Sequence, residues 1–262
     1  MKRVLVIGAN SYIGKKFYEY VDSLDEKLID VDMVSAADGS WEKVDFSIYD
    51  SVLHLSAIVH RKEKKNMREL YEEVNHQLPV KIASKAKANN VKQFIFMSTA
   101  AVYGDISGCI NKEVIPKPTT LYGMTKLAAE NELLSLKDEN YKIAIIRSPM
   151  VYGNGCYGNY ERLRKLTRIT PIFPDYHNKR SRIYIDKLNY FLFNIIVELN
   201  DGYFFPQDKR YLDICEEVVA IRNEGGKKTY CISILNGLIH SLKRRVKIFN
   251  KAFGDFYYDM NI

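Results

Sequence analysis

Two patterns of apolar positions alternate along the first half of the chain. Short runs rich in β-branched residues are typical of buried strands, and longer stretches with apolar residues every three or four positions are typical of amphipathic helices. Strands are predicted at residues 4–7, 28–34, 51–55, 94–98 and 143–147. Helices are predicted at residues 13–24, 67–89 and 122–136. This alternation predicts an α/β fold with a doubly wound parallel sheet that carries helices on both faces.

The regular alternation stops after Pro149. Residues 151–178 are rich in Gly, Asn, Tyr and Pro, and such a change of composition predicts a domain boundary. A predicted helix at residues 186–199 and a short strand at residues 203–205 then resume the first pattern. We therefore expect a smaller second part of the chain that is interleaved with the first.

The composition is that of a globular chain with a basic surplus. The 262 residues are 47% hydrophobic and include only 7 prolines, which argues against long disordered segments. The net charge is +7, but basic and acidic residues are interspersed except in clusters at residues 61–65 and 243–247. No nucleic-acid-binding module is recognisable, so the surplus favours an anionic small substrate, with nucleic acid the weaker alternative.

The termini and the cysteines bear on location and redox state. The charged pair Lys2-Arg3 leads into a four-residue apolar run that is too short for a signal peptide, and the later run at residues 191–197 is far below a membrane span. These features predict a cytoplasmic protein. The four cysteines lie far apart without metal-ligand spacing, so we expect reduced thiols and no metal site. They are Cys109, Cys156, Cys215 and Cys231.

A glycine-rich loop, residues 8–14, follows the first strand directly and opens the first helix. Small residues let the backbone approach a pyrophosphate, and the helix start offers N–H groups and a positive dipole end. This context favours a dinucleotide site over a plain strand-to-helix turn, although Ser11 replaces a usual glycine. The expected cofactor contacts are Gly8, Asn10, Ser11, Tyr12, Ile13 and Gly14.

An acidic residue about 20 positions further along usually binds the adenosine ribose of such a cofactor. Asp32 is the candidate and Asp38 the reserve, and either could instead be an ordinary turn residue. No arginine follows Asp32 immediately, which favours NAD over NADP.

Tyr122 and Lys126 lie four residues apart, so on a helix they share one face. A free phenol has a pKa of about 10 and needs a nearby positive charge to act as a base near neutrality. Lys126 would be that charge. The alternative is a solvated contact without chemistry, since this spacing also occurs by chance.

Three motifs in order carry a resemblance to a known family: the loop at residues 8–14, the strand and turn at residues 94–104, and residues 122–126. Over residues 1 to about 210 the chain resembles the extended short-chain dehydrogenase/reductase superfamily and its NAD-dependent epimerase/dehydratase family. The closest likeness is to bacterial UDP-glucose (UDP-galactose) 4-epimerases. The resemblance implies a Rossmann-type NAD-binding domain and a small C-terminal substrate-binding domain. Their expected bounds are 1–150 and 151–262, with about 184–206 returning to the Rossmann domain.

The resemblance assigns roles to individual positions. Thr99 matches the catalytic Ser/Thr that bonds the sugar oxygen, with Ser98 as its nearby substitute, Tyr122 matches the base and Lys126 its partner. Further cofactor contacts are implied in the His-x-Ala-Gly-like segment and in the helical Val-Asn pair. The implied contacts are Leu55, Ser56, Ala57, Asn75, Ser98, Tyr122 and Lys126. His54 is more simply explained as a packed histidine.

The second half contains the implied substrate contacts, which join Thr99 and Tyr122. Residues 147–153 resemble the segment that leads into the sugar-nucleotide pocket. Asn159 matches a residue near the substrate phosphates, and Arg180 matches the arginine that grips the pyrophosphate, for which a planar guanidinium is well suited. Surface solvation is the alternative for Arg180.

Ala100 and Ala101 discriminate among the reactions of the family. Nucleotide-sugar dehydratases carry an Asp-Glu pair here, so the resemblance implies redox at the sugar carbon without elimination. It implies a 4-epimerase of UDP-hexoses or UDP-N-acetylhexosamines, in cell-surface polysaccharide synthesis and as a homodimer. An NAD(P)H-dependent reductase of a 4-keto nucleotide sugar, or a catalytically impaired cofactor-binding homologue, is the alternative.

The segment at residues 232–251 is apolar with several basic residues. A basic amphipathic helix on an anionic membrane would have this pattern. A substrate-domain helix with a solvated basic face is the simpler interpretation, and we favour it.

Overall fold

The central element is a six-stranded sheet in which every neighbouring pair is parallel. The computed structural model describes residues 1–59, 65–156, 160, 163–165, 167 and 171–262. The strand order β10-β6-β4-β3-β1-β2 confirms the predicted doubly wound parallel sheet. Its strands are β1 (Lys2–Ile7), β2 (Ile29–Val34), β3 (Ser51–His54), β4 (Gln93–Thr99), β6 (Lys142–Ser148) and β10 (Gly202–Phe204).

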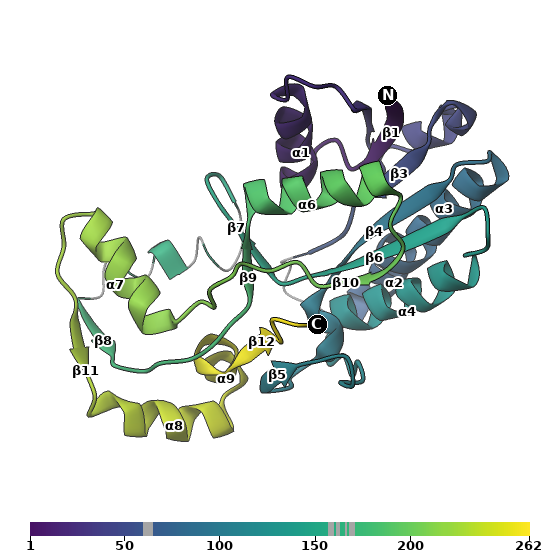
Figure 1. Ribbon diagram of the computed structural model, residues 1–262. Helices are drawn as coiled ribbons and strands as arrows, with labels where there is room; N and C mark the ends of the chain where they lie inside the picture. Colours follow the sequence, from purple (N-terminus) through teal and green to yellow (C-terminus); the bar gives the residue numbers. More distant parts are fainter. Residues whose placement is uncertain (60–64, 157–159, 161–162, 166, 168–170) are drawn as a thin grey trace.

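Helices cover both faces of this sheet (Figure 1). On one face α1 (Tyr12–Asp22) and α6 (Ile185–Glu198) pack on the strands, burying Phe17 and Leu192 with the β1 side chains of Val4 and Val6. On the other face lie α3 (Leu78–Ala88) and α4 (Leu121–Ser135). The period-two pattern of the strands therefore supplies two apolar cores, one on each face.

The helix predicted at residues 67–89 is three consecutive segments. A turn η3 (Lys65–Met67) leads into α2 (Arg68–Glu72), and a π-helical turn η4 (Glu73–Gln77) separates α2 from α3. π-helical turns inside helices are frequent at functional sites. This one contains the fully buried Asn75.

The order of strands sets the position of a ligand site. The chain leaves β1 for β2 on one side and then crosses to β3 on the other, so β1 and β3 flank a topological switch point. Ligands of open parallel sheets bind outside the carboxyl ends of the strands at such a point. Between β2 and β3 the chain forms only two short 3₁₀ turns, η1 (Ser40–Lys43) and η2 (Phe46–Ile48), which leaves β2 as the sheet edge.

Other described elements form a lobe beside the carboxyl ends of the strands (Figure 1). Three two-stranded parallel pairs stabilise it, and its apolar cluster includes Phe173, Val218 and Phe253. The strands are β5 (Gly108–Ile110), β7 (Met150–Tyr152), β8 (Ile172–Pro174), β9 (Arg182–Tyr184), β11 (Tyr230–Ile232) and β12 (Phe256–Tyr258). The helical elements are η5 (Ala100–Tyr103), α7 (Ile214–Glu224), α8 (Leu235–Arg245) and α9 (Lys247–Phe253).

The basic tail segment contains two helices rather than one, because α8 ends at Arg245 and α9 begins at Lys247. Lys243 donates a hydrogen bond of 2.6 Å to the hydroxyl of Tyr176, and Ile239 and Phe253 are buried in the lobe. These contacts tie the segment to the lobe, and membrane contact stays a prediction. Within the described ranges, no helix has the length and apolar character needed to cross a bilayer.

Candidate functional site at the carboxyl ends of the strands

The glycine loop joins β1 to α1 at the switch point of the sheet. Gly8 has a φ of +129°, and a Cβ there would lie 3.2 Å from the backbone nitrogen of Ser56 and 3.3 Å from Leu55. A Cβ on Gly14 would lie 2.8 Å from the carbonyl oxygen of Gly8. Only glycine permits this close approach. The loop, the end of β3 and the start of α1 therefore meet as the fingerprint predicts, and their bare backbone fits a dinucleotide.

The other loop residues have distinct positions. Ser11, which replaces a usual glycine, is the N-cap of α1 and accepts a hydrogen bond of 3.0 Å from the backbone of Gly14. Tyr12 donates to the carbonyl oxygen of Asn154 at 3.0 Å, which ties the loop to the second half of the chain. Asn10 is exposed in the turn, and Ile13 packs on the core.

The structure separates the two candidates for the ribose acid. Asp32 lies two residues before the end of β2, level with Leu5, and its carboxylate accepts hydrogen bonds of 2.8 Å from both Arg3 and Tyr49. Because the strand continues to Val34, this places Asp32 inside the edge strand rather than at its end. Asp38 lies in the loop beyond the strand end, where its carboxylate accepts from the backbone of Ser40.

The segment after β3 is held by the predicted helical asparagine. Asn75 is fully buried, and its side-chain amide accepts from the Ile58 nitrogen at 2.8 Å and donates to the Ile58 oxygen at 3.1 Å. These two hydrogen bonds fix the segment after β3, which contains Leu55, Ser56 and Ala57. Leu55 and Ser56 lie next to Gly8. His54 stacks between the rings of Phe94 and Phe96, and burial lowers its pKa to about 3.

Tyr122 lies in the first turn of α4, next to the end of β4. A Cβ on Gly123 would lie 2.5 Å from the carbonyl oxygen of Ala101, so glycine lets the helix approach η5 closely. Thr120 caps the helix through the backbone of Gly123. Burial raises the pKa of Tyr122 to about 12, while a hydrogen bond with the Thr99 side chain opposes the rise. The predicted base and the predicted hydroxyl partner are thus in contact.

Lys126 follows one turn later and is 1% exposed. Its ammonium donates 2.8 Å to the carbonyl oxygen of Met97 and lies 4.2 Å above the centre of the Phe96 ring. Burial lowers the pKa of Lys126 to about 7, against the opposing attraction of Glu130. The lysine that was predicted to stabilise the phenolate is therefore held at the strand, with an ammonium that gives up its proton easily.

Ser98 does not accompany Thr99. Strand alternation turns Ser98 toward α4, where its hydroxyl donates to the buried Glu130. The placement therefore does not support its predicted roles as substitute for Thr99 and as cofactor contact. Glu130 also accepts 2.6 Å from Arg147, which in turn donates 2.9 Å to the hydroxyl of Tyr103. This buried network was missed, although the regular spacing of residues 122, 126 and 130 is a visible signal.

The predicted substrate contacts in the second half of the chain are Asn159 and Arg180. Asn159 lies outside the described residues. Arg180 is half-buried and donates 2.9 Å to the carbonyl oxygen of Gly254, with its guanidinium 5.7 Å from the centre of the Phe256 ring. Burial lowers the pKa of this guanidinium below its usual value. In this arrangement one N–H group of the Arg180 guanidinium is already hydrogen-bonded to the backbone oxygen of Gly254. Binding of a substrate pyrophosphate by Arg180 stays a prediction.

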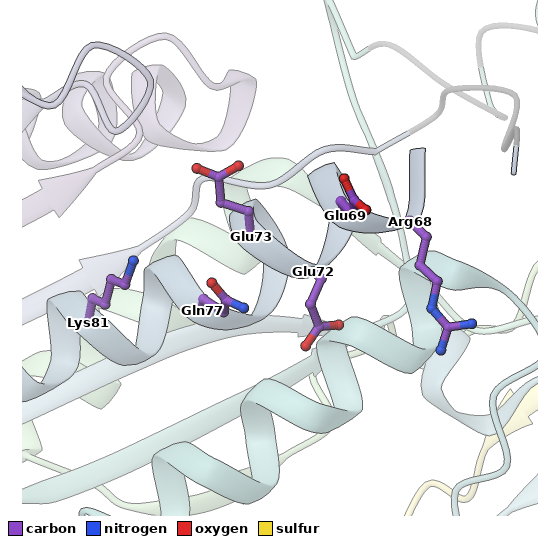
Figure 2. A pocket seen from close by; sticks show the side chains of 6 residues that line it. All are labelled: Arg68, Glu69, Glu72, Glu73, Gln77 and Lys81. Atoms are coloured by element: carbon purple, nitrogen blue, oxygen red, sulfur yellow. The ribbon is translucent and has the colours of Figure 1, made fainter. Parts of the chain in front are cut away.

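A cavity of about 540 Å³ lies elsewhere, over the continuous helical stretch α2–η4–α3. All six lining side chains come from this one stretch (Figure 2), so the cavity is a surface groove. They are Arg68, Glu69, Glu72, Glu73, Gln77 and Lys81. The groove contains none of the predicted site residues.

A parallel sheet with a glycine loop at its switch point, and a Thr–Tyr–Lys group beside the next strand ends, defines a short-chain dehydrogenase/reductase. Residues 4–186 match the model of the NAD dependent epimerase/dehydratase family, and the chain belongs to that family. NAD is the cofactor in the name of the family, which confirms the predicted cofactor.

Known proteins are similar over different parts of the chain. A UDP-glucose 4-epimerase of Vibrio cholerae is 36% identical over 146 residues, which are 52% of this chain and 44% of the relative. A UDP-glucuronic acid 4-epimerase of Bacillus cereus, solved with NAD, has a TM-score of 0.73 at 22% identity over 87% of this chain and 84% of its own. A dTDP-4-dehydrorhamnose reductase of Clostridium acetobutylicum has a TM-score of 0.69 at 20% identity. The match covers 88% of this chain and 82% of the reductase.

The structural matches and the sequence match support different conclusions. The two solved structures are below 25% identity and show the fold alone. The matched part is less than half the length of the Vibrio cholerae relative. The reaction and the substrate of this chain are therefore matters of proposal.

Proposed function

We propose that this protein is an NAD-dependent 4-epimerase of nucleotide sugars, either UDP-hexoses or UDP-N-acetylhexosamines, that acts through a transient 4-keto sugar. The contact between Thr99 and Tyr122 carries the proposal, because it joins a hydroxyl and a phenol at the strand ends beside the glycine loop. The similarity to a UDP-glucose 4-epimerase supports the substrate class. A role in cell-surface polysaccharide synthesis and a homodimer belong to the same proposal.

The chemistry of the site follows from these residues. Deprotonated Tyr122 takes the proton of the sugar 4-hydroxyl, and Thr99 orients that oxygen by a hydrogen bond. When bound, NAD⁺ would supply the hydride acceptor for C4 and a positive charge. Since burial raises the pKa of Tyr122 to about 12, Tyr122 needs such a charge before it can act as a base near neutrality. When the hydride comes back to the opposite face of the 4-keto carbon, Tyr122 returns the proton to the oxygen, which gives the 4-epimer.

The turn after Thr99 limits the reaction. Ala100 and Ala101 form η5, and neither side chain can donate or accept a proton. Elimination of water requires an acid and a base beside the sugar. The methyl groups of this turn therefore favour epimerisation, or reduction of a ketone, over dehydration.

The test is conversion of UDP-glucose, UDP-galactose and their N-acetyl forms by the purified protein, with chromatographic separation of the 4-epimers. We expect epimers without added reductant. Tyr122→Phe is expected to lower the rate by about 10²–10⁴-fold, because it removes the base. Its NAD affinity should stay within about tenfold of the parent value, since the loss of one hydrogen bond costs about 0.5–1.5 kcal/mol.

A matched control is Tyr190→Phe, because Tyr190 is 59% exposed on α6. This variant should turn over like the parent. Absence of epimer from all four substrates would contradict the proposal. Consumption of NADH with a 4-keto nucleotide sugar would then favour the reductase, and NAD binding without any turnover would favour a catalytically impaired homologue.

A further inference from the structure

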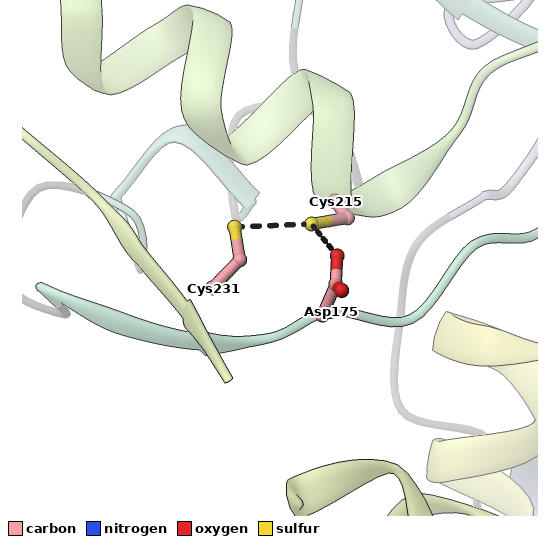
Figure 3. Close-up of side chains that lie close together, drawn as sticks. All are labelled: Asp175, Cys215 and Cys231. Atoms are coloured by element: carbon pink, nitrogen blue, oxygen red, sulfur yellow. Dashed lines mark hydrogen bonds between the residues drawn. The ribbon is translucent and has the colours of Figure 1, made fainter. Parts of the chain in front are cut away.

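Two cysteines that are 16 positions apart in the sequence meet in the lobe. The sulfur atoms of Cys215 and Cys231 lie 3.3 Å apart, and the Cys215 sulfur is 3.9 Å from a carboxylate oxygen of Asp175 (Figure 3). One ligand atom from each of these three residues lies within 4.8 Å of the others. Both cysteines are free thiols, and the fold brings them together although they are far apart in the sequence.

The separations resemble the edges of a metal coordination shell. Two thiolates bound tetrahedrally at about 2.3 Å from zinc lie about 3.8 Å apart. A disulfide requires about 2.05 Å. The observed 3.3 Å is about 0.5 Å from the first value and about 1.2 Å from the second. The geometry of the pair is thus closer to shared metal ligands than to a covalent bond.

A histidine lies beside the same carboxylate. His177 Nε2 is 3.3 Å from Asp175 Oδ1, and nitrogen and oxygen ligands at about 2.0–2.1 Å from tetrahedral zinc have a similar separation. His177 Nδ1 contacts Asp213 at 2.9 Å. His177 is thus held between two carboxylates beside the cluster, and it is not one of the three residues whose ligand atoms lie within 4.8 Å of one another.

A hydrogen bond from Ser233 orients the Asp175 carboxylate, and a cavity connects this carboxylate to solvent. Asp175 Oδ2 accepts a hydrogen bond of 3.0 Å from Ser233, which leaves Oδ1 directed toward Cys215 and His177. Asp175, His177, Cys215 and Cys231 all line one cavity of about 600 Å³. An ion can therefore reach the cluster from solvent.

We propose that Asp175, Cys215 and Cys231 bind a divalent cation of the zinc class. Thiolate and carboxylate are ligand types of such sites. Binding displaces the two thiol protons to solvent.

The site joins three elements of the lobe. Cys215 lies at the start of α7, Cys231 in β11 and Asp175 directly after β8. The buried apolar cluster of the lobe is small, and structural metals add folding free energy where a core is thin. The proposed metal is a structural ion of the lobe and takes no part in epimerisation.

The first experiment uses the unaltered protein. After reduction, chelation and dialysis it is titrated with Zn²⁺ alone, and cysteine alkylation is followed site by site by mass spectrometry. We expect one Zn²⁺ per chain and protection of Cys215 and Cys231, with no change at Cys109 and Cys156. Co²⁺ is expected to give the near-ultraviolet absorption of a sulfur-to-cobalt charge transfer.

Variants then assign the ligands. The pair Cys215→Ser with Cys231→Ser should lose more than the about 10–100-fold in Zn²⁺ affinity that loss of an outer partner causes. Cys109→Ser with Cys156→Ser is the matched control and should bind Zn²⁺ like the parent. Alkylation that is indifferent to Zn²⁺ would overturn the proposal. A Cys215–Cys231 disulfide in protein purified without reductant, together with no retained zinc, would overturn it in favour of a redox pair.

Discussion

Two buried cations pack at α4, Lys126 within the helix and Arg147 from β6 against Glu130 of the helix, and their surroundings differ. Lys126 is 1% exposed, and its ammonium has a carbonyl oxygen and the face of a ring as neighbours. Arg147 is also buried, but its guanidinium donates to both oxygens of Glu130 and to Tyr103. Burial lowers the pKa of Lys126 to about 7, whereas Glu130 raises the pKa of Arg147 above its usual value.

The difference teaches how this fold separates structure from chemistry. A buried cation with a bidentate acid is fixed in one charge state and holds α4 against β4 and β6. A buried cation without a closely bonded acid can change its charge near neutrality, as groups in active sites often do. The contrast therefore assigns Arg147 to stability and Lys126 to the proposed reaction, and the following variants test this division.

The largest effect is expected from Glu130→Ala. It leaves the guanidinium of Arg147 buried without its acid, and loss of one partner of a buried ion pair costs about 3–5 kcal/mol of unfolding free energy. Urea denaturation gives the value. Glu132→Ala, on the exposed side of the same helix, is the control and should cost less than about 1 kcal/mol. A loss below about 1 kcal/mol for Glu130→Ala would remove the structural half of the comparison.

Lys126→Met should separate activity from stability. We expect the epimerase rate to fall by about 10²–10³-fold, because the variant loses the predicted partner of the base, which is also an expected cofactor contact. Unfolding free energy should change by less than about 1.5 kcal/mol, since the variant loses one hydrogen bond but also a desolvated charge. A stability loss as large as that of Glu130→Ala would show that both cations are structural.

The lowered pKa of Lys126 in the folded protein also predicts that the free energy of unfolding depends on pH. The folded pKa of about 7 lies below the ordinary value of 10.5, so between these values the unfolded chain binds more protons at this site. Stability from Lys126 should therefore rise with pH from about 7 to about 10, with a slope of at most about 1.4 kcal/mol per pH unit. Melting curves of the parent and of Lys126→Met should diverge in this window. Parallel curves would contradict the lowered pKa.

The smallest effect is expected at the sheet edge, where charges are paired in solvent. Asp32 and Arg3 are about half exposed, so Asp32→Asn should change unfolding free energy by less than about 1 kcal/mol. Because the carboxylate is held inside β2, we also expect NAD affinity to change less than threefold. A tenfold loss of affinity measured by calorimetry would restore Asp32 as the ribose ligand.

Much of the fold could be predicted because its signals are local. Apolar runs identified the five main strands, and the glycine loop identified the switch point, since Gly8 and Gly14 are required by contacts within a few residues or with the next strand end. The contact of Tyr122 with Thr99 followed from the family resemblance. These positions combine a short motif with a fixed place on a strand or helix.

The other features of the fold and the site depend on contacts between segments that are distant in the sequence, and no local pattern predicts such contacts. The Glu130–Arg147 pair needs the register of α4 over β6, and the end of β2 needs the sheet pairing with β1. The cysteine cluster needs the pairing of β8 with β11, which joins distant segments. Strand alternation explains why Ser98 and Thr99, although adjacent, serve different networks.

The position of β10 has a consequence for how the protein is made. This strand closes the sheet beside β6, and α6 before it covers the apolar face, yet both are synthesised after part of the lobe. A chain that stops near residue 180 would expose the edge of β6 and the uncovered side chains of Ile146 and Met97. Open edges of this kind pair with other chains, so such a nascent or truncated chain is expected to aggregate until residue 204 is complete.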